Sequence, residues 1–283
     1  MAIQGQLTKS NFGYSMPVDA PLYDPFPVYY EDASILIFPY VTSAAAAAAL
    51  LPAQLALAPV LDEKGNEVPG AALAQVVFAK YGFSNIGGYN EVAQVIVATY
   101  SGSVQDAVGK PLLFAVRLHV DSDMAMAAGR EIGGFPKKIG HIEFHETPVY
   151  FSSLESPKGL RICSGELNPY SKVAEQRLLP AAAQQLPLSY VSMRVIPDAS
   201  SVTPPYTPSV CQLIYTEWVL TDGTLWGARG ALSFTGASAL NPYHALPILK
   251  QAPPWSAQAP ATPGTALFRG RMTISKVVIM ENF

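Results

Sequence analysis

The chain has 283 residues, of which 49% are hydrophobic and only 14% are charged, and its formal net charge is -3. A charged share this far below the usual ~25% indicates that the solvent-exposed surface is small for the length of the chain, which favours a homo-oligomer. The small net charge excludes a basic surface for nucleic acid or anionic lipid. We therefore expect the partners to be small molecules and further copies of the chain.

The N-terminal part is predicted to be an extended arm, over about residues 1–30, of a single domain that spans 1–283. It is rich in Pro, Tyr and Asp, and it lacks the basic and apolar regions of a signal peptide, so we expect a cytoplasmic protein. Residues 43–58 are apolar but shorter than the ~20 residues of a membrane span. A short helix, capped by Ser43 and ending before Pro52, is expected instead, with no membrane segment.

Most of the remaining chain has the pattern of β-strands. Apolar, β-branched and aromatic runs, several of them alternating with polar residues, are separated by Gly, Pro and Asp turns. The predicted strands are 34–38, 74–83, 91–100, 112–120, 141–151, 160–167, 188–196, 210–220, 227–234 and 272–280. This pattern predicts a mainly β (α+β) fold, a barrel or a sandwich with a few helices.

Only two further helices are predicted. One covers 122–130, with Ser122 or Asp123 as its N-cap, and the other covers 171–179 and ends at Pro180. The proline-rich segments 196–209 and 249–264 are expected to be loops or arms.

Metal ions and nucleotide cofactors are not expected. Cys163 and Cys211 are too few for a disulfide scaffold and lie in apolar contexts typical of buried, inert thiols. His141 and His145 belong to an alternating segment, which favours a solvent-exposed strand face over a metal site. No G-x-G-x-x-G motif follows a strand into a helix.

The segment GREIGGFPKKIG (129–140) places two lysines side by side in apolar surroundings. Pro136 biases the preceding residue toward an extended backbone, in which consecutive side chains point to opposite faces. Only one of Lys137 and Lys138 can then enter a given cavity. A lysine amine is normally protonated at neutral pH, so a nucleophilic role requires burial or a neighbouring cation. A solvent-exposed turn is the alternative interpretation of the lysine pair alone.

As a whole, GREIGGFPKKIG resembles the sequence motif of the acetoacetate decarboxylase family: Gly-Arg-Glu, an apolar spacer, an aromatic residue, Pro-Lys-Lys, an apolar residue and Gly. IGGYNEVAQVIV (86–97) and the segment 210–249 are similar to other parts of that family. The resemblance implies an antiparallel, cone-shaped β-barrel with peripheral helices, assembled into oligomers, with the active site inside the barrel.

The same resemblance implies roles for individual residues. Lys137 matches the lysine that forms a Schiff base with the substrate. Lys138 matches its companion, the neighbouring lysine to which lowering of the nucleophile's pKa is attributed. Glu91 matches the active-site carboxylate. Arg130 and Glu131 match a pair that we expect to brace the lysine loop. No cofactor or metal is implied.

Two polar groups of the family pocket are missing from this chain. The family arginine of the N-terminal segment has no counterpart, since no arginine precedes Arg117. A second family glutamate is also missing, because its position aligns near Val76. The resemblance therefore implies a Schiff-base lyase, most simply a decarboxylase of a 3-keto acid such as acetoacetate. An aldolase-dehydratase acting on pyruvate or a larger keto acid, and a ligand-binding barrel without catalysis, remain open.

Further polar and aromatic residues lie on the predicted C-terminal strands and could line a barrel. For each of them, core packing or an oligomer contact is the expected role. They are Tyr215, Glu217, Trp218, Trp226 and Arg229.

Overall fold

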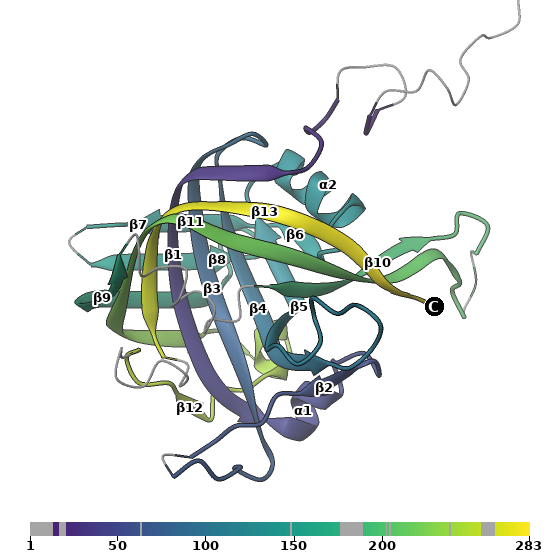
Figure 1. The fold of residues 1–283 in the computed structure, drawn as a ribbon. Coiled ribbons are helices and arrows are strands. Elements are labelled where there is room, and N and C mark those ends of the chain that lie inside the picture. The colour runs from purple at the N-terminus through teal and green to yellow at the C-terminus, as the bar shows by residue number, and fades with distance from the viewer. Residues whose placement is uncertain are drawn as a thin grey trace, which may run out of the picture.

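A computed structural model describes residues 14–16, 21–62, 64–147, 149–175, 189–201, 203, 205–237, 239–255 and 264–283. The fold is mainly β, with few helices (Figure 1). The helices are α1 (Ala44–Ala48), α2 (Asp123–Glu131) and a 3-10 turn (Pro242–Ala245). The strands are β1 (Val28–Ser43), β2 (Leu55–Leu57), β3 (Ala71–Ser84), β4 (Tyr89–Tyr100), β5 (Leu112–Val120), β6 (Lys137–Ile139), β7 (His141–His145), β8 (Tyr150–Glu155), β9 (Arg161–Glu175), β10 (Tyr190–Pro197), β11 (Pro208–Phe234), β12 (Lys250–Gln251) and β13 (Ala266–Asn282).

The long strands close into a ring in the order β5, β4, β3, β1, β13, β11, β10 and back to β5. Neighbours in the ring are antiparallel except β10 and β5, which are parallel and pair at Tyr190↔Leu113 and Val191↔Phe114. Figure 1 shows α2 beside β6 at one end of the ring, and α1 with β2 at the other. The predicted, mainly antiparallel barrel is therefore confirmed.

A second layer covers part of the outside of the ring. β11 continues beyond its pairing with β10 and pairs with β9, to which β8 and β7 are added in turn. Side chains alternate between the two faces of the ring strands. On β3, Val77 and Ala79 belong to the inner apolar cluster, whereas Val76 and Phe78 belong to a cluster between the ring and the outer layer.

The capping residues expected for the helices are present. The Ser43 hydroxyl accepts a hydrogen bond from the backbone N–H of Ala46 at the start of α1. Ser122, rather than Asp123, is the N-cap of α2, and its hydroxyl accepts from the N–H of Ala125. In the part of the chain that the structure describes, no helix has both the length and the apolar character needed to cross a membrane.

Two strand predictions are corrected. The single strand predicted at 141–151 is a hairpin of β7 and β8, because the chain turns back at Glu146, whose carboxylate is held by Ser34 and Lys80. Conversely, 210–220 and 227–234 are one strand, β11. The intervening Asp222-Gly223 resembles a turn in sequence but stays paired with β13, directly after a register shift between Leu220 and Asp222.

The helix predicted at 171–179 is wrong over 171–175, which are the end of β9, and 176–179 lie outside the described residues. Pairing with β11, such as Ser171↔Gly227, overrides the local helical pattern. Cys163 is buried as expected, but Cys211 is only half-buried. At the end of the predicted arm, Tyr23 is buried in the inner cluster of its own chain.

Candidate active site

The Lys137 side chain enters the interior of the ring from β6. A tight loop between α2 and β6 positions it: Gly134 has a φ of +69°, and a β-carbon there would lie 2.8 Å from the backbone nitrogen of Arg194. This position therefore requires glycine. β6 then pairs in parallel with β5, with Lys137 opposite Leu118.

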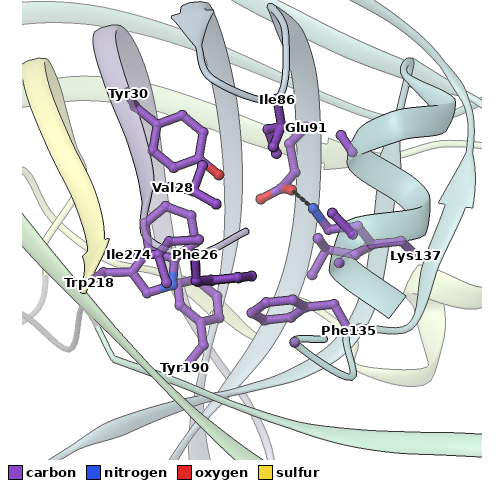
Figure 2. Close-up of a pocket in the computed structure, with 15 residues that line it drawn as sticks. Phe26, Val28, Tyr30, Ile86, Glu91, Phe135, Lys137, Tyr190, Trp218 and Ile274 are labelled. Carbon is purple, nitrogen blue, oxygen red and sulfur yellow. Dashed lines mark ion pairs between the residues drawn. The ribbon is translucent and has the colours of Figure 1, made fainter. Parts of the chain in front are cut away.

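Lys137 and Glu91 form a buried ion pair (Figure 2). The Nζ of Lys137 lies 2.8 Å from Oε2 of Glu91, and the two residues are only 5% and 7% exposed. Nζ also lies 5.4 Å from the ring centre of Tyr89 and 5.6 Å from that of Phe135. A buried ion pair loses much of its hydration, so transfer of one proton, which leaves a neutral amine and a carboxylic acid, relieves that cost.

The pair faces a small, mostly apolar chamber inside the ring, with a cavity volume of about 20 Å3. Among the described residues that line this chamber, Lys137 and Glu91 are the only charged ones. Figure 2 shows Tyr30, Trp218 and Tyr190 on the side opposite Lys137. Its apolar side chains include Phe26, Val28, Ile86, Leu118, Phe135 and Ile274.

The aromatic residues of the chamber carry neutral polar groups. Burial, followed by the Glu91 carboxylate, raises the pKa of Tyr190 above its ordinary value, and burial raises that of Tyr30. The hydroxyls of Tyr30 and Tyr89 lie 3.0 Å apart in a hydrogen bond. The indole N–H of Trp218 is buried and finds no hydrogen-bond partner among the described residues. The chamber therefore offers uncharged donors beside one lysine and one carboxylate.

Arg130 and Glu131 contact the lysine loop rather than the chamber. The Nη1 of Arg130 donates a hydrogen bond to the Lys137 carbonyl at 3.2 Å, and Arg194 donates to the Glu131 carbonyl at 3.0 Å. The Tyr23 hydroxyl donates to the Glu131 carboxylate at 2.5 Å. These contacts are what a bracing role would require.

Lys138 points to the other side of β6. It is exposed, whereas Lys137 is buried, as the alternation along an extended chain requires. Its ammonium group acts instead on His119. Burial, then the charge of Lys138 and that of Arg117, lowers the pKa of His119 to about 4. The structure thus brings Lys137 and Glu91 together and separates Lys138 from both.

The two family groups that the sequence lacks, an arginine and a second glutamate, have no counterpart in the described lining of the chamber. No arginine is among the described residues that line it. Arg117 instead donates a hydrogen bond to Gln94, which packs against Tyr40 outside the inner cluster. Val76 faces the outer cluster. The described lining of the chamber therefore contains no cation other than Lys137.

Of the C-terminal candidates, only Trp218 lines the chamber. Tyr215 is buried in a third apolar cluster, and Glu217 accepts a hydrogen bond from Ser275. Trp226 packs against the outer cluster, and Arg229 lies over the ring of Tyr170. Tyr30 and Tyr190 were not singled out from the sequence, because the pairing that turns them inward joins distant parts of the chain.

The candidate metal ligands remain apart. His141 and His145 are exposed on β7, as expected for a solvent-facing strand. Within the described ranges, no three side chains of the types that bind metals lie close enough to share an ion.

A family model described as acetoacetate decarboxylase matches residues 15–256 of the chain. The decarboxylase DEC1 of Cochliobolus heterostrophus is 26% identical over 88% of this chain and 91% of its own length. An acetoacetate decarboxylase of Chromobacterium violaceum is 29% identical over 84% and 86%. The crystal structure of acetoacetate decarboxylase from Legionella pneumophila superposes with a TM-score of 0.73 at 19% identity, covering 100% of this chain and 98% of the other.

Proposed function

The chain belongs to the acetoacetate decarboxylase family, and on that premise we propose that it is a lyase that decarboxylates a 3-keto acid through a Schiff base on Lys137. The buried pair of Lys137 and Glu91 in an apolar chamber is the observation that carries this proposal. It supplies an amine, a proton acceptor within hydrogen-bond reach and surroundings that disfavour charge.

The first steps form the Schiff base. Glu91 accepts a proton from Lys137 across the 2.8 Å contact and leaves a neutral amine. The amine attacks the C3 carbonyl of the substrate, the proton returns from Glu91, and water leaves. The product is an iminium ion that joins Nζ to C3. The iminium withdraws electrons from the neighbouring C2 in an apolar site, where loss of the charged substrate carboxylate as neutral carbon dioxide is favoured.

Decarboxylation follows from the electron demand of the iminium. The bond between C1 and C2 breaks, carbon dioxide leaves, and its bonding electrons form the C2–C3 double bond of a neutral enamine. A proton from solvent, delivered through Glu91, adds to C2. Water then hydrolyses the resulting iminium, which releases a methyl ketone and regenerates Lys137.

Reductive trapping tests the proposal. Protein incubated with acetoacetate and cyanoborohydride should gain one adduct by intact mass and release carbon dioxide; Lys137→Ala should do neither. Lys138→Ala is the matched control and should still form the adduct. A pyruvate adduct without carbon dioxide release from acetoacetate would contradict the decarboxylase assignment and support an aldolase-dehydratase. Absence of any adduct with acetoacetate, pyruvate or a longer 3-keto acid would leave only a ligand-binding barrel.

A further inference from the structure

A second chamber lies inside the ring, next to the one that holds Lys137. Its cavity volume is about 40 Å3, and it shares Tyr190 and Trp218 with the first chamber. The ring centres of these two residues are 5.6 Å apart. The remaining lining is mainly aliphatic and aromatic, with Gln75 as its one amide side chain among the described residues, and includes Ile35, Val77, Leu113, Leu220, Phe268 and Met272. Tyr190 and Trp218 therefore form the boundary between the two chambers.

Two features indicate that these chambers accept a ligand. Protein interiors are packed closely and seldom leave voids larger than a water molecule, and apolar voids stay dry and bind apolar molecules. The two cavities of about 20 and 40 Å3 adjoin each other in one core. At their boundary, the buried indole N–H of Trp218 lacks a partner among the described residues, although a buried donor without an acceptor is costly.

A substrate as small as acetoacetate leaves the second chamber unused. Its methyl group would end near Lys137, and nothing apolar would reach Val77 or Leu220. Among the described residues, neither chamber contains an arginine that would hold a small, highly polar acid. Substrate binding must then depend mainly on apolar contact.

We propose that the substrate is a 3-oxo acid of medium chain length, with C3 at Lys137 and its alkyl chain directed past Tyr190 and Trp218 into the second chamber. This assignment rests on the proposed Schiff-base chemistry, which converts 3-oxooctanoate to 2-heptanone and carbon dioxide. Burial of each additional methylene favours binding roughly fourfold. From acetoacetate to 3-oxooctanoate, four methylenes are added, and kcat/KM should rise by about 250-fold.

A chain-length series on the unmodified protein is the first test. Values of kcat/KM are measured for acetoacetate, 3-oxohexanoate, 3-oxooctanoate and 3-oxodecanoate, and the proposal expects a rise up to the eight-carbon acid. A flat series, or one in which acetoacetate is the best substrate, overturns it.

Variants of the second chamber test whether the preference for longer acids arises there. Val77→Phe fills the chamber and should lower the ratio of kcat/KM for 3-oxooctanoate to that for acetoacetate at least about tenfold. Leu220→Ala enlarges it and should move the preferred length to longer acids. Leu232→Ala is the matched control: it truncates a buried leucine on the same strand, β11, but in the outer cluster. Equal changes of the ratio in all three variants overturn the proposal, and Leu220→Ala decides the matter if Val77→Phe does not fold.

Ligand binding by Lys137→Ala separates this proposal from the proposed function. Titration calorimetry with 2-heptanone and acetone does not depend on Schiff-base formation. Tighter binding of 2-heptanone supports the chamber even if no adduct forms on the unmodified protein. Equally weak binding of both ketones, together with decarboxylation of acetoacetate by the unmodified protein, removes the chain-length assignment and leaves the proposed function intact.

Discussion

Gly129 lies directly against the side chain of Lys137: a β-carbon at position 129 would be 2.5 Å from Cδ and 2.6 Å from Cε of the lysine. Gly129 is within α2, where glycine is otherwise a poor helix former. The space that glycine leaves is therefore occupied by the lysine chain, and α2 acts as a wall that directs Nζ toward Glu91.

Gly129→Ala should separate folding from chemistry. Alanine favours a helix by about 1 kcal/mol over glycine, so the melting temperature should stay unchanged or rise. The flexible lysine chain would be displaced, and displacement of a reacting group by about 1 Å can lower a rate about 100-fold. Trapping with cyanoborohydride measures the rate of adduct formation, and thermal unfolding followed by circular dichroism measures stability. Normal trapping in a stable variant would contradict this account of Gly129.

Glu91→Gln should remove proton transfer while keeping the side-chain shape. General acid–base catalysis commonly contributes 10²–10⁴-fold, so kcat should fall at least about 100-fold. Steady-state carbon dioxide release is the measurement. Glu166→Gln, which changes an exposed carboxylate on β9, is the control. Activity within about twofold of the unmodified protein would show that Glu91 orients the substrate and does not carry a proton.

Lys138→Ala should leave the pH dependence of kcat/KM nearly unchanged. Lys138 is exposed and points away from Glu91 and Lys137, and a solvent-exposed charge is screened over about 10 Å at 0.1 M salt. The pH profile should move by less than about half a unit. A displacement of a full unit or more would favour the companion role that the family resemblance implies for Lys138.

Stability should fall at acidic pH because of His119. Its pKa is lowered from 6.5 to about 4 in the folded protein, mainly by burial, and the residue is 4% exposed. Above pH ~6.5 the ring is neutral in both states, whereas between ~6.5 and ~4 only the unfolded chain takes up a proton. The free energy of unfolding should therefore fall by up to about 3 kcal/mol as the pH decreases through this window.

Urea unfolding at pH 7.5, 6 and 5 measures this effect. His119→Gln should flatten that part of the pH dependence, whereas His141→Gln, at an exposed position on β7, should not. An unchanged slope in His119→Gln would assign the acid sensitivity to other groups.

The sequence predicts local structure well and closure of the ring poorly. Alternation places β3, β4 and β5 correctly, and the motif around Pro136 identifies Lys137, which is the one buried lysine among the residues that the structure describes. The pattern fails where tertiary pairing decides, as at Asp222-Gly223, which looks like a turn but lies within a continuous strand. Tyr30 comes from β1, far along the chain from Tyr190 on β10 and Trp218 on β11, and no local pattern reveals that the three share a wall.

The homo-oligomer expected from the low charged share remains a prediction. Sedimentation velocity measures it directly: a single species near 30.2 kDa would contradict it. Assembly would also cover part of the exposed apolar surface, including Phe83, Tyr206 and Leu249, which are 62%, 69% and 63% exposed.

The parallel contact of β10 with β5 gives the ring one weak seam. It has two paired positions, one of them at Tyr190, whereas β3 follows β1 along almost its whole length. Separating β10 from β5 breaks few hydrogen bonds, so we expect the ring to open locally at this contact while its other strand pairings stay intact. Amide hydrogens of β10 and β5 that bond across this contact should exchange faster than those of β3, and a bound medium-chain ketone should slow them. Tyr190, one of the two residues at the boundary of the chambers, thus lies at the shortest strand pairing in the ring.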